Sequence, residues 1–432
     1  MSTSISGNLV AGFDEARFGD LVNRAGSRES RERAFERYRA LPLPHGQIEE
    51  WRRTDPAWFP FGRLAFDPAL GRGKDGAGSG PGDDRFAAVV TIGDDGMSVR
   101  DVSGAIRAGQ LEIASLADGE PGFDLVQRGF DVGVKSAEPN KMALLSRSFW
   151  NVGVRVRVPD GVELERGVLV RSSFSKDGSL VIPRIAVEAG RGSRAVILEE
   201  LSSPADRTLL VAAAREMWAS ENAALQYVAL QDLGGQSFYL ADDRAHAERN
   251  GRVHWIGLNL GARLGKMNFS GEVAGEGAAA ELDGLYFASG EQHLDQRTLQ
   301  IHSAPHTTSN LLYKGAVRDR ARSVYQGLII ARPGAVKVDA YQKNNNIVLN
   351  EGARADSLPG LEIDTDDLKC SHGSTIGNLD AEQVFYLRTR GMDERDARRT
   401  LLKGFFEEIA ARVPFEFVRD RIERHVEEQL GR

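Results

Sequence analysis

The amino-acid sequence predicts a mainly β protein whose core is a β-helix, and three features carry this prediction. Between Asn151 and about Ile363 the chain is a series of short apolar runs with little helical spacing. The run VGVRVRV (152–158) alternates apolar and polar residues, as half-buried strands do. Turn-like motifs that contain glycine recur before such runs, at Gly192, Gly277, Gly334 and Gly352.

This repetition favours a solenoid, although its period is loose. The last two motifs begin 18 residues apart, and the earlier ones are further apart. Loosely repeated turn-and-strand units over about 200 residues are typical of a β-helix. The run Asn344-Asn345-Asn346 fits the same architecture, because stacked coils can carry asparagine ladders at a turn. A β-sandwich is the alternative on the pattern alone.

Residues 1–85 are predicted to form a helical region with a glycine-rich linker. Residues recur every four positions from Phe13 to Ala25, and Pro42 ends the helical pattern. The interleaved acidic and basic residues of 29–37 predict a solvated helix face. The stretch 71–84 contains the spacing G-x-G-x-x-G, but further glycines and a proline follow where a dinucleotide site needs a helix, so we interpret it as a linker.

The rest of the chain divides into three parts. Residues 86–150 are predicted to be a mixed α/β segment that leads into the core, and 151–365 the β-helix itself. Residues 366–432 are predicted to form a C-terminal helical domain. Asp380 and Asp393 are candidate N-caps there, and Pro414 separates the last two helices.

The composition is that of a globular protein, and it argues against several classes of function and of site. The chain has 432 residues, with 55 Lys+Arg against 62 Asp+Glu and a net charge of -7, which argues against a dedicated nucleic-acid binder. Neither a membrane span nor a basic-then-apolar leader is readable, so we expect a cytoplasmic protein without a membrane contact. The single cysteine, Cys370, excludes an internal disulfide and a metal site of several internal thiolates.

The segment Lys369-Cys370-Ser371-His372-Gly373 is the first candidate for chemistry. In an extended chain Cys370 and His372 share one face, because side chains alternate. Thiolate and imidazole are good ligands for iron or zinc, and they also form nucleophilic dyads. The structural alternative is a small buried thiol next to a turn histidine. Two ligands do not close a tetrahedral metal site, so a partner chain would have to supply the others.

A second candidate groups three histidines within 14 residues, His293, His302 and His306, with Asp295 beside them. A metal site is one interpretation, but we favour ordinary polar residues on a solenoid. The carboxylates Asp364, Asp366 and Asp367 fit a linker as well as an acid/base pair. The stretch 261–267 departs from a P-loop, and no G-x-S-x-G sequence occurs, so the residues alone do not indicate an enzyme.

Residues 338–391 resemble the SufB/SufD family of iron–sulfur cluster assembly proteins. The densest matches are Pro359, Leu361-Glu362-Ile363, Asp366-Asp367, Lys369-Cys370-Ser371-His372-Gly373 and Phe385-Tyr386-Leu387-Arg388. Residues 293–319 extend the likeness, and Leu41-Pro42 with Glu50-Trp51-Arg52 and Thr54 resembles the family's N-terminal motif more weakly. The single cysteine and the short chain favour the SufD branch over the SufB branch.

The resemblance implies a right-handed parallel β-helix between helical N- and C-terminal domains. It also implies a complex in which the chain pairs with a SufB-like scaffold subunit through the β-helices, and we expect strands near 330–365 to form that interface. A SufC ATPase would bind the C-terminal helical region and carry out the hydrolysis, so the chain itself is not expected to be an enzyme. An isolated chain is compatible with a homodimer.

The resemblance also suggests where a cluster would form. ATP-driven closure of SufC would open the interface to a transient iron–sulfur cluster, with His372 as the preferred ligand and Cys370 beside it; no cofactor is expected on the chain alone. The apolar row Phe405, Ile409, Phe415 and Val418 is the expected SufC dock. The competing hypothesis is a cytosolic β-helix enzyme that acts on a carbohydrate-like substrate.

Overall fold

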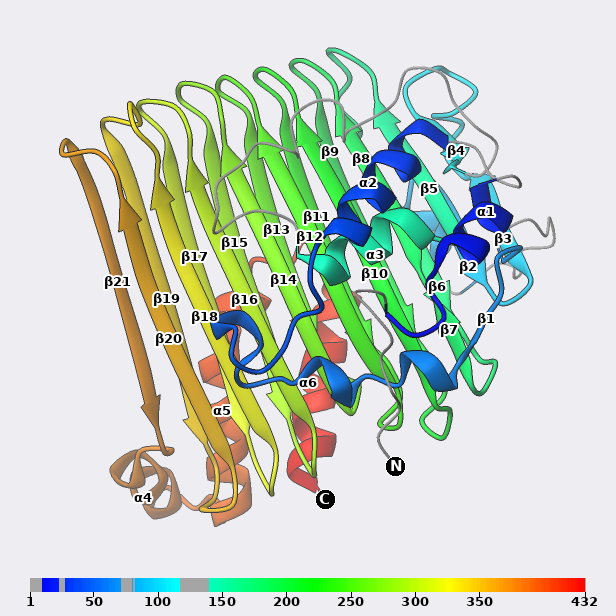
Figure 1. Cartoon of the computed structure of the whole chain (residues 1–432). Helices are drawn as coiled ribbons and strands as arrows, with labels where there is room; N and C mark the ends of the chain where they lie inside the picture. The colour runs from blue at the N-terminus through cyan, green and yellow to red at the C-terminus, as the bar shows by residue number, and fades with distance from the viewer. Residues whose placement is uncertain (1–9, 23–27, 71–79, 81, 117–139, 432) are drawn as a thin grey trace.

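The computed structural model describes residues 10–22, 28–70, 80, 82–116 and 140–431. Its core is a parallel β-helix of about eight turns, which confirms the expected fold class (Figure 1). Each turn contributes one strand to each of two sheets, so strands two apart in sequence are neighbours in space. The predicted linker lies mostly outside the described residues.

Sheet A is closed at its start by an antiparallel pair, and all later neighbours are parallel. The strands of sheet A, in spatial order, are β4 (Glu112–Ser115), β5 (Val152–Val158), β8 (Pro183–Ala189), β10 (Leu209–Ala219), β12 (Phe238–Ala247), β14 (Leu264–Val273), β16 (His293–His302), β18 (Arg322–Ala331) and β20 (Arg354–Ile363). The short strand β7 (Ser179–Val181) pairs with β10 and with β1 (Ala65–Phe66).

Sheet B follows the same rule, with the antiparallel pair of β2 and β3 at its start. Its strands, in spatial order, are β3 (Gly96–Asp101), β2 (Ala88–Gly93), β6 (Val168–Ser173), β9 (Arg194–Ser202), β11 (Ala224–Asp232), β13 (Arg252–Asn259), β15 (Ala279–Ala288), β17 (Thr308–Val317), β19 (Val338–Val348) and β21 (Leu368–Gly377). The β-helix thus runs to Gly377, beyond the boundary expected at 365, and part of the 86–150 segment joins it as β2.

One turn position sets the true period of the coil. At this position the backbone is left-handed, with φ between 54° and 73°, in Gly192, Asn222, Asn250, Gly277, His306 and Lys337. Most of these residues donate their backbone N–H to a carbonyl of the next coil, as Asn222 does to Arg249 and His306 to Val336. Consecutive members are 27 to 31 residues apart. The spacing of 18 seen in the sequence, from Gly334 to Gly352, therefore compared two different turns of the coil. Glycine and asparagine adopt this conformation at low cost.

The interior of the solenoid changes character along its length. From β5 to β15 the inward residues are mainly Val, Ile, Leu and Ala, which form one continuous apolar core. From β16 onward they include Gln, Thr, His and Asn. Asn344 and Asn346 lie on strand β19 inside the coil, where Asn346 donates to Asn344 (2.7 Å), rather than in a ladder at a turn.

The N-terminal helices α1 (Glu15–Val22), α2 (Arg28–Ala40) and α3 (Lys141–Phe149) cover the outer face of sheet A (Figure 1). Aromatic side chains such as Phe35 and Phe149, whose rings contact each other, belong there to the same apolar cluster as Leu210 of β10. Arg31 is fully buried and donates to the carbonyls of Ser148 and Trp150, so the charged face predicted for α2 is not wholly solvated.

The C-terminal helices are α4 (Ala381–Thr389), α5 (Glu394–Ala410) and α6 (Glu416–Gly431). Asp380 and Asp393 cap α4 and α5 as predicted, because each carboxylate accepts backbone N–H groups of the first turn. Helices α5 and α6 lie behind sheet B, whereas α4 stands at the end of the solenoid (Figure 1). The chain therefore covers the outer face of each sheet with one of its terminal regions.

A charged cluster is buried inside the early coils. Arg215 donates to Glu199 (2.8 Å) and to Asp243 (3.1 Å), and all three side chains are almost completely inaccessible. Burial raises the pKa of the Asp243 carboxyl to about 7; the charge of Arg215 opposes this rise and that of Glu199 adds to it. One cation thus faces two carboxylates, one of which holds its proton up to near neutral pH.

We predict that Asp243→Asn becomes relatively more stabilising as the pH rises. Because the pKa of Asp243 is raised in the folded state, its contribution to stability is fully present below about pH 4 and is lost as the pH rises through about 7. One pKa unit corresponds to about 1.4 kcal/mol, so the difference in unfolding free energy between variant and wild type should move by roughly 2–4 kcal/mol between pH 4 and pH 8. Urea unfolding at a series of pH values measures it, and a difference independent of pH would contradict the assignment.

Candidate functional site

Cys370 and His372 lie on β21, the last strand of sheet B. Their register partners on β19 are Ala340 and Gln342, which are buried and point into the solenoid. Because side chains of paired parallel strands stack in register, Cys370 and His372 continue these inward columns at the end of the coil. They belong to the β-helix itself, whereas the sequence interpretation placed them between its last strand and the helical domain.

The last coil leaves the solenoid open. Strands β20 and β21 each pair on one side only, and no described strand covers their other edges. Three of the inward columns therefore end in exposed apolar side chains, with Leu361 41% exposed, Ile363 38% and Ile376 48%. Both features, the unpaired edges and the uncovered apolar columns, are those of a surface that another coil can continue.

The two candidate ligands differ in environment. The Cys370 side chain is half-buried and packs with Ile329, Val338 and Ala340. Burial raises the pKa of the Cys370 thiol, and the charge of Asp339 adds to the rise. His372 is exposed at the end of the column. A thiol that resists deprotonation is a weaker metal ligand, so this geometry favours the imidazole over the sulfur.

The three other candidate histidines lie in different parts of the fold. His302 is inside the coil between the hydroxyls of Thr307 and Ser309, both at 2.8 Å. His293 is on the outer face of sheet A, where its Nε2 lies 2.9 Å from Oγ1 of Thr54. His306 occupies the left-handed turn position. Burial lowers the pKa of both His293 and His302 to about 4.

These histidines therefore do not form one site. In the part of the chain that the structure describes, no group of three or more His, Cys, Asp or Glu side chains is arranged to hold a metal ion. The carboxylates Asp364, Asp366 and Asp367 lie in the turn between β20 and β21, where Asp367 pairs with Lys337 (2.7 Å).

A polar cluster fixes the N-terminal region on sheet A, and the sequence analysis named several of its residues without connecting them. Lys266 and Asp295 are fully buried and pair at 2.9 Å, and Lys266 also donates to the carbonyl of Glu50 (2.8 Å). Thr54 donates to Asp295. The residues Glu50 and Thr54 of the N-terminal motif thus contact the solenoid, although only the spacing of that motif was visible in the sequence.

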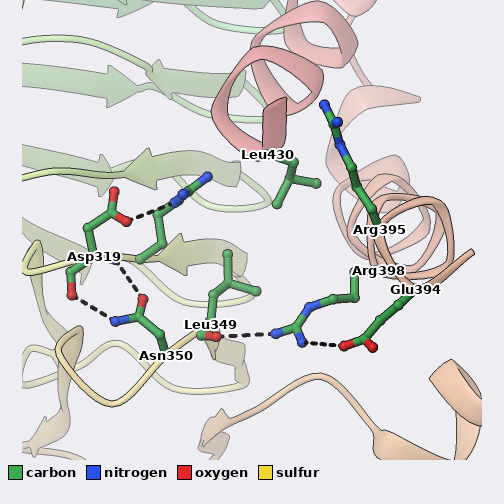
Figure 2. A pocket seen from close by; sticks show the side chains of 8 residues that line it. Asp319, Leu349, Asn350, Glu394, Arg395, Arg398 and Leu430 are labelled. Atoms are coloured by element: carbon green, nitrogen blue, oxygen red, sulfur yellow. Dashed lines mark hydrogen bonds and ion pairs between the residues drawn. The ribbon is translucent and has the colours of Figure 1, made fainter. Parts of the chain in front are cut away.

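A hollow lies where the turns after β17 and β19 meet α5 and α6 (Figure 2). Arg398 donates to the carbonyl of Leu349 (3.2 Å) and pairs with Glu394 (3.5 Å). Asn350 and Asp319 bond each other through amide and backbone groups. Most of the polar groups around this hollow therefore serve each other, and they join the C-terminal helices to the solenoid.

The apolar row expected to receive an ATPase is covered by the chain itself. Ile409 and Val418 are fully buried, and Phe405 and Phe415 are partly buried against the outer face of sheet B. The i+4 spacing marked a helix face correctly, but that face packs on the solenoid. The exposed apolar residues of this region lie on α4, where Phe385 is 67% exposed and Tyr386 56%.

The family described as "SUF system FeS cluster assembly, SufBD core domain" matches residues 172–405, which include most of the solenoid, all of α4 and most of α5. The chain belongs to the SufBD family. This is a scaffold-type family of iron–sulfur cluster assembly proteins rather than a family of enzymes.

Curated relatives agree with this assignment. A SufBD family protein of Mycobacterium leprae is 38% identical over 216 residues, which cover 48% of this chain and 55% of the relative. A SufBD family protein of Mycobacterium tuberculosis is 37% identical over 223 residues, 50% of this chain and 56% of the relative. SufD of Escherichia coli is 29% identical over 244 residues, 56% and 58% of the two chains. The chain spans about half the length of the curated relatives it matches.

The family match contains both Cys370 and His372, together with the open end of the solenoid. Among the described helices, none is long and apolar enough to cross a membrane. The residue that sequence reasoning missed beside the two candidate ligands is Gln342, because only the register of β19 and β21 places it next to His372.

Proposed function

We propose that this SufBD family protein is the SufD-type subunit of a cytoplasmic Suf assembly complex. It would pair with a SufB-like subunit, bind a SufC-type ATPase and support the assembly of an iron–sulfur cluster. Its likeness to E. coli SufD and its single cysteine support the SufD branch. The observation that carries the proposal is the open end of the solenoid. Unpaired strand edges and two potential iron ligands lie together there.

The pairing surface is the end of the last coil. A partner of the same coil geometry would extend both sheets by main-chain hydrogen bonds to β20 and β21, and its inward residues would cover Leu361 and Ile376. Strands β18 and β19 already have neighbours on both sides, so the proposed contact strands are β20 and β21 (354–377), of which only β20 lies within the expected range 330–365. A second copy of this chain offers the same edge, which would explain a homodimer when partners are absent.

The cluster would form at this junction. Cys370 and His372 occupy neighbouring inward positions on the last strand, β21. A coil stacked on β21 would therefore enclose them between the two subunits. Neutral imidazole and thiolate both coordinate iron, and two ligands from one chain leave positions for the partner's groups. The raised pKa of the Cys370 thiol favours His372 as the more important ligand.

The ATPase would dock on α4. This helix has no buried residue and exposes Phe385 and Tyr386, and the exposed Met392 follows it in the sequence. So large an exposed aromatic pair on a short helix is typical of a protein-binding surface. Removing the whole C-terminal domain is a poor test, because it would also expose the apolar outer face of sheet B.

We expect Ile376→Asp to weaken binding of the SufB-like subunit by roughly a hundredfold or more, because a charge would replace an exposed apolar side chain that the partner must bury. Co-purification and calorimetric titration measure the effect. The matched control is Val99→Asp, which changes another exposed apolar residue, 39% against 48% exposed, at the opposite end of sheet B. Undiminished binding by a folded Ile376→Asp chain would exclude this end as the interface.

We expect His372→Ala to leave the complex assembled but to lower its iron and acid-labile sulfide content, because the variant loses the more exposed of the two proposed ligands. Cys370→Ala should lower them less, since its thiol stays largely protonated. Gel filtration confirms assembly before iron and sulfide are measured. If His372→Ala carries as much cluster as wild type in an intact complex, His372 is not a ligand.

We expect the double variant Phe385→Ala/Tyr386→Ala to lose most of its binding to the SufC-type ATPase, because interface hot spots are enriched in tyrosine and truncating one costs about 2 kcal/mol or more. Binding to the SufB-like subunit should not change. Trp58→Ala, an exposed aromatic on the N-terminal region, is the control. The dock lies elsewhere if the double variant retains the ATPase.

A further inference from the structure

The side-chain amide of Gln342 is buried and makes no hydrogen bond among the described residues. It is 0% exposed, and neither its Oε1 nor its Nε2 has a hydrogen-bond partner among the described residues. A buried amide group without a partner costs about 1–3 kcal/mol, so its presence calls for an explanation.

The neighbouring polar residues do not share this property. Asn344 donates to the carbonyl of Tyr313 (3.2 Å) and accepts from Ser357 (2.7 Å), and Asn346 donates to Asn344 (2.7 Å). Gln300, on the opposite sheet, donates to Ser309 (2.8 Å). Gln300 leaves its Oε1 and Gln296 its Nε2 without a partner, so single unpaired amide atoms recur in this interior, but among the described residues only Gln342 leaves both amide atoms unpaired.

The column that contains Gln342 shows that packing does not require an amide here. Along sheet B its register positions hold apolar side chains in the three coils before it and end in a histidine, in the order Trp255, Leu282, Leu311, Gln342 and His372. A leucine at 342 would continue the column. The change to glutamine occurs only at the position next to His372, about 4.8 Å away along the sheet.

The opposite wall leaves room for the amide. Gly327 of β18 faces it, and a Cβ atom built on Gly327 would come 2.3 Å from Nε2 of Gln342. The amide thus occupies the space above a residue without a side chain, in a part of the coil that a second subunit would close.

We infer that Gln342 is a positioning residue for His372, an inference that rests on the proposed function. When a partner coil covers β21, His372 is buried at the end of this column. The carboxamide oxygen of Gln342 then accepts the N–H of the imidazole nitrogen that does not face iron. This bond fixes the tautomer and the ring orientation, as outer-shell partners of metal-bound histidines do.

The test compares Gln342→Leu with wild type, both as isolated chain and in the complex assembled with the SufB-like subunit and the ATPase. The isolated variant should melt at the same temperature or higher, because an unpaired buried amide is replaced by an apolar group. In the complex, iron retention against the chelator bathophenanthroline should fall roughly tenfold to a hundredfold. The coupling of imidazole nitrogen to the reduced cluster, seen by pulsed electron paramagnetic resonance, should change or disappear.

Two variants sharpen this comparison. Gln342→Glu keeps an acceptor oxygen and should restore most of the iron retention. Gln296→Leu removes another buried amide, on β16, and should leave the cluster unchanged. If Gln342→Leu does not assemble, Gln342→Met takes its place.

The outcomes separate this inference from the proposed function. Normal iron retention and normal nitrogen coupling in Gln342→Leu, with loss of cluster in His372→Ala, would overturn the positioning role alone; an internal water that satisfies the amide predicts this result. Retention of cluster in His372→Ala would instead overturn the ligand role itself. A fall in the melting temperature of isolated Gln342→Leu would show that the amide serves the fold.

Discussion

The in-register stacking of parallel coils is the constraint on which the rest of this structure depends. Each inner strand pairs with the strands one coil before and one coil after it, and most turn residues at the left-handed position donate a hydrogen bond to the next coil. Nothing in this repeated pairing limits the number of coils. At its start the antiparallel strands β3 and β4 cap it, whereas β21 at its end has no described neighbour on its outer side. The asymmetry between these two ends decides where another coil can be added.

Much of this architecture could be predicted from the sequence, because alternation, caps and turns are local signals. The core, the helix starts at Asp380 and Asp393, and the apolar row of α5 and α6 were readable in this way. The coil period was not, since residues as different as Gly192, His306 and Lys337 occupy the same turn position. Without the period the register was unknown, so neither the place of Cys370 inside the last coil nor its relation to Gln342 could be derived.

Two other failures have the same physical origin, which is that charge and polarity do not reveal burial. Arg31 lies in a run of alternating charges that predicts a solvated face, yet its guanidinium is enclosed by backbone carbonyls and the ring of Trp150. Asn344 and Asn346 suggested an asparagine ladder at a turn, yet they lie on a strand and bond each other inside the coil. In both cases the polar groups bond residues that are distant in sequence. A local sequence pattern cannot predict such partners.

The way in which the chain covers its own faces explains why the end of the solenoid and α4 remain for partners. On sheet A the N-terminal region is held by the buried pair of Lys266 and Asp295. On sheet B the C-terminal helices are held by Lys314, which donates to the carbonyl of Phe405 (2.8 Å), and by the pair of Arg412 with Asp283 (2.8 Å). Both covers combine large apolar contacts with buried charges, which are costly to separate. A partner that competed for either outer face would have to break them, whereas a coil added to β20 and β21 would only continue bonds that the fold already makes.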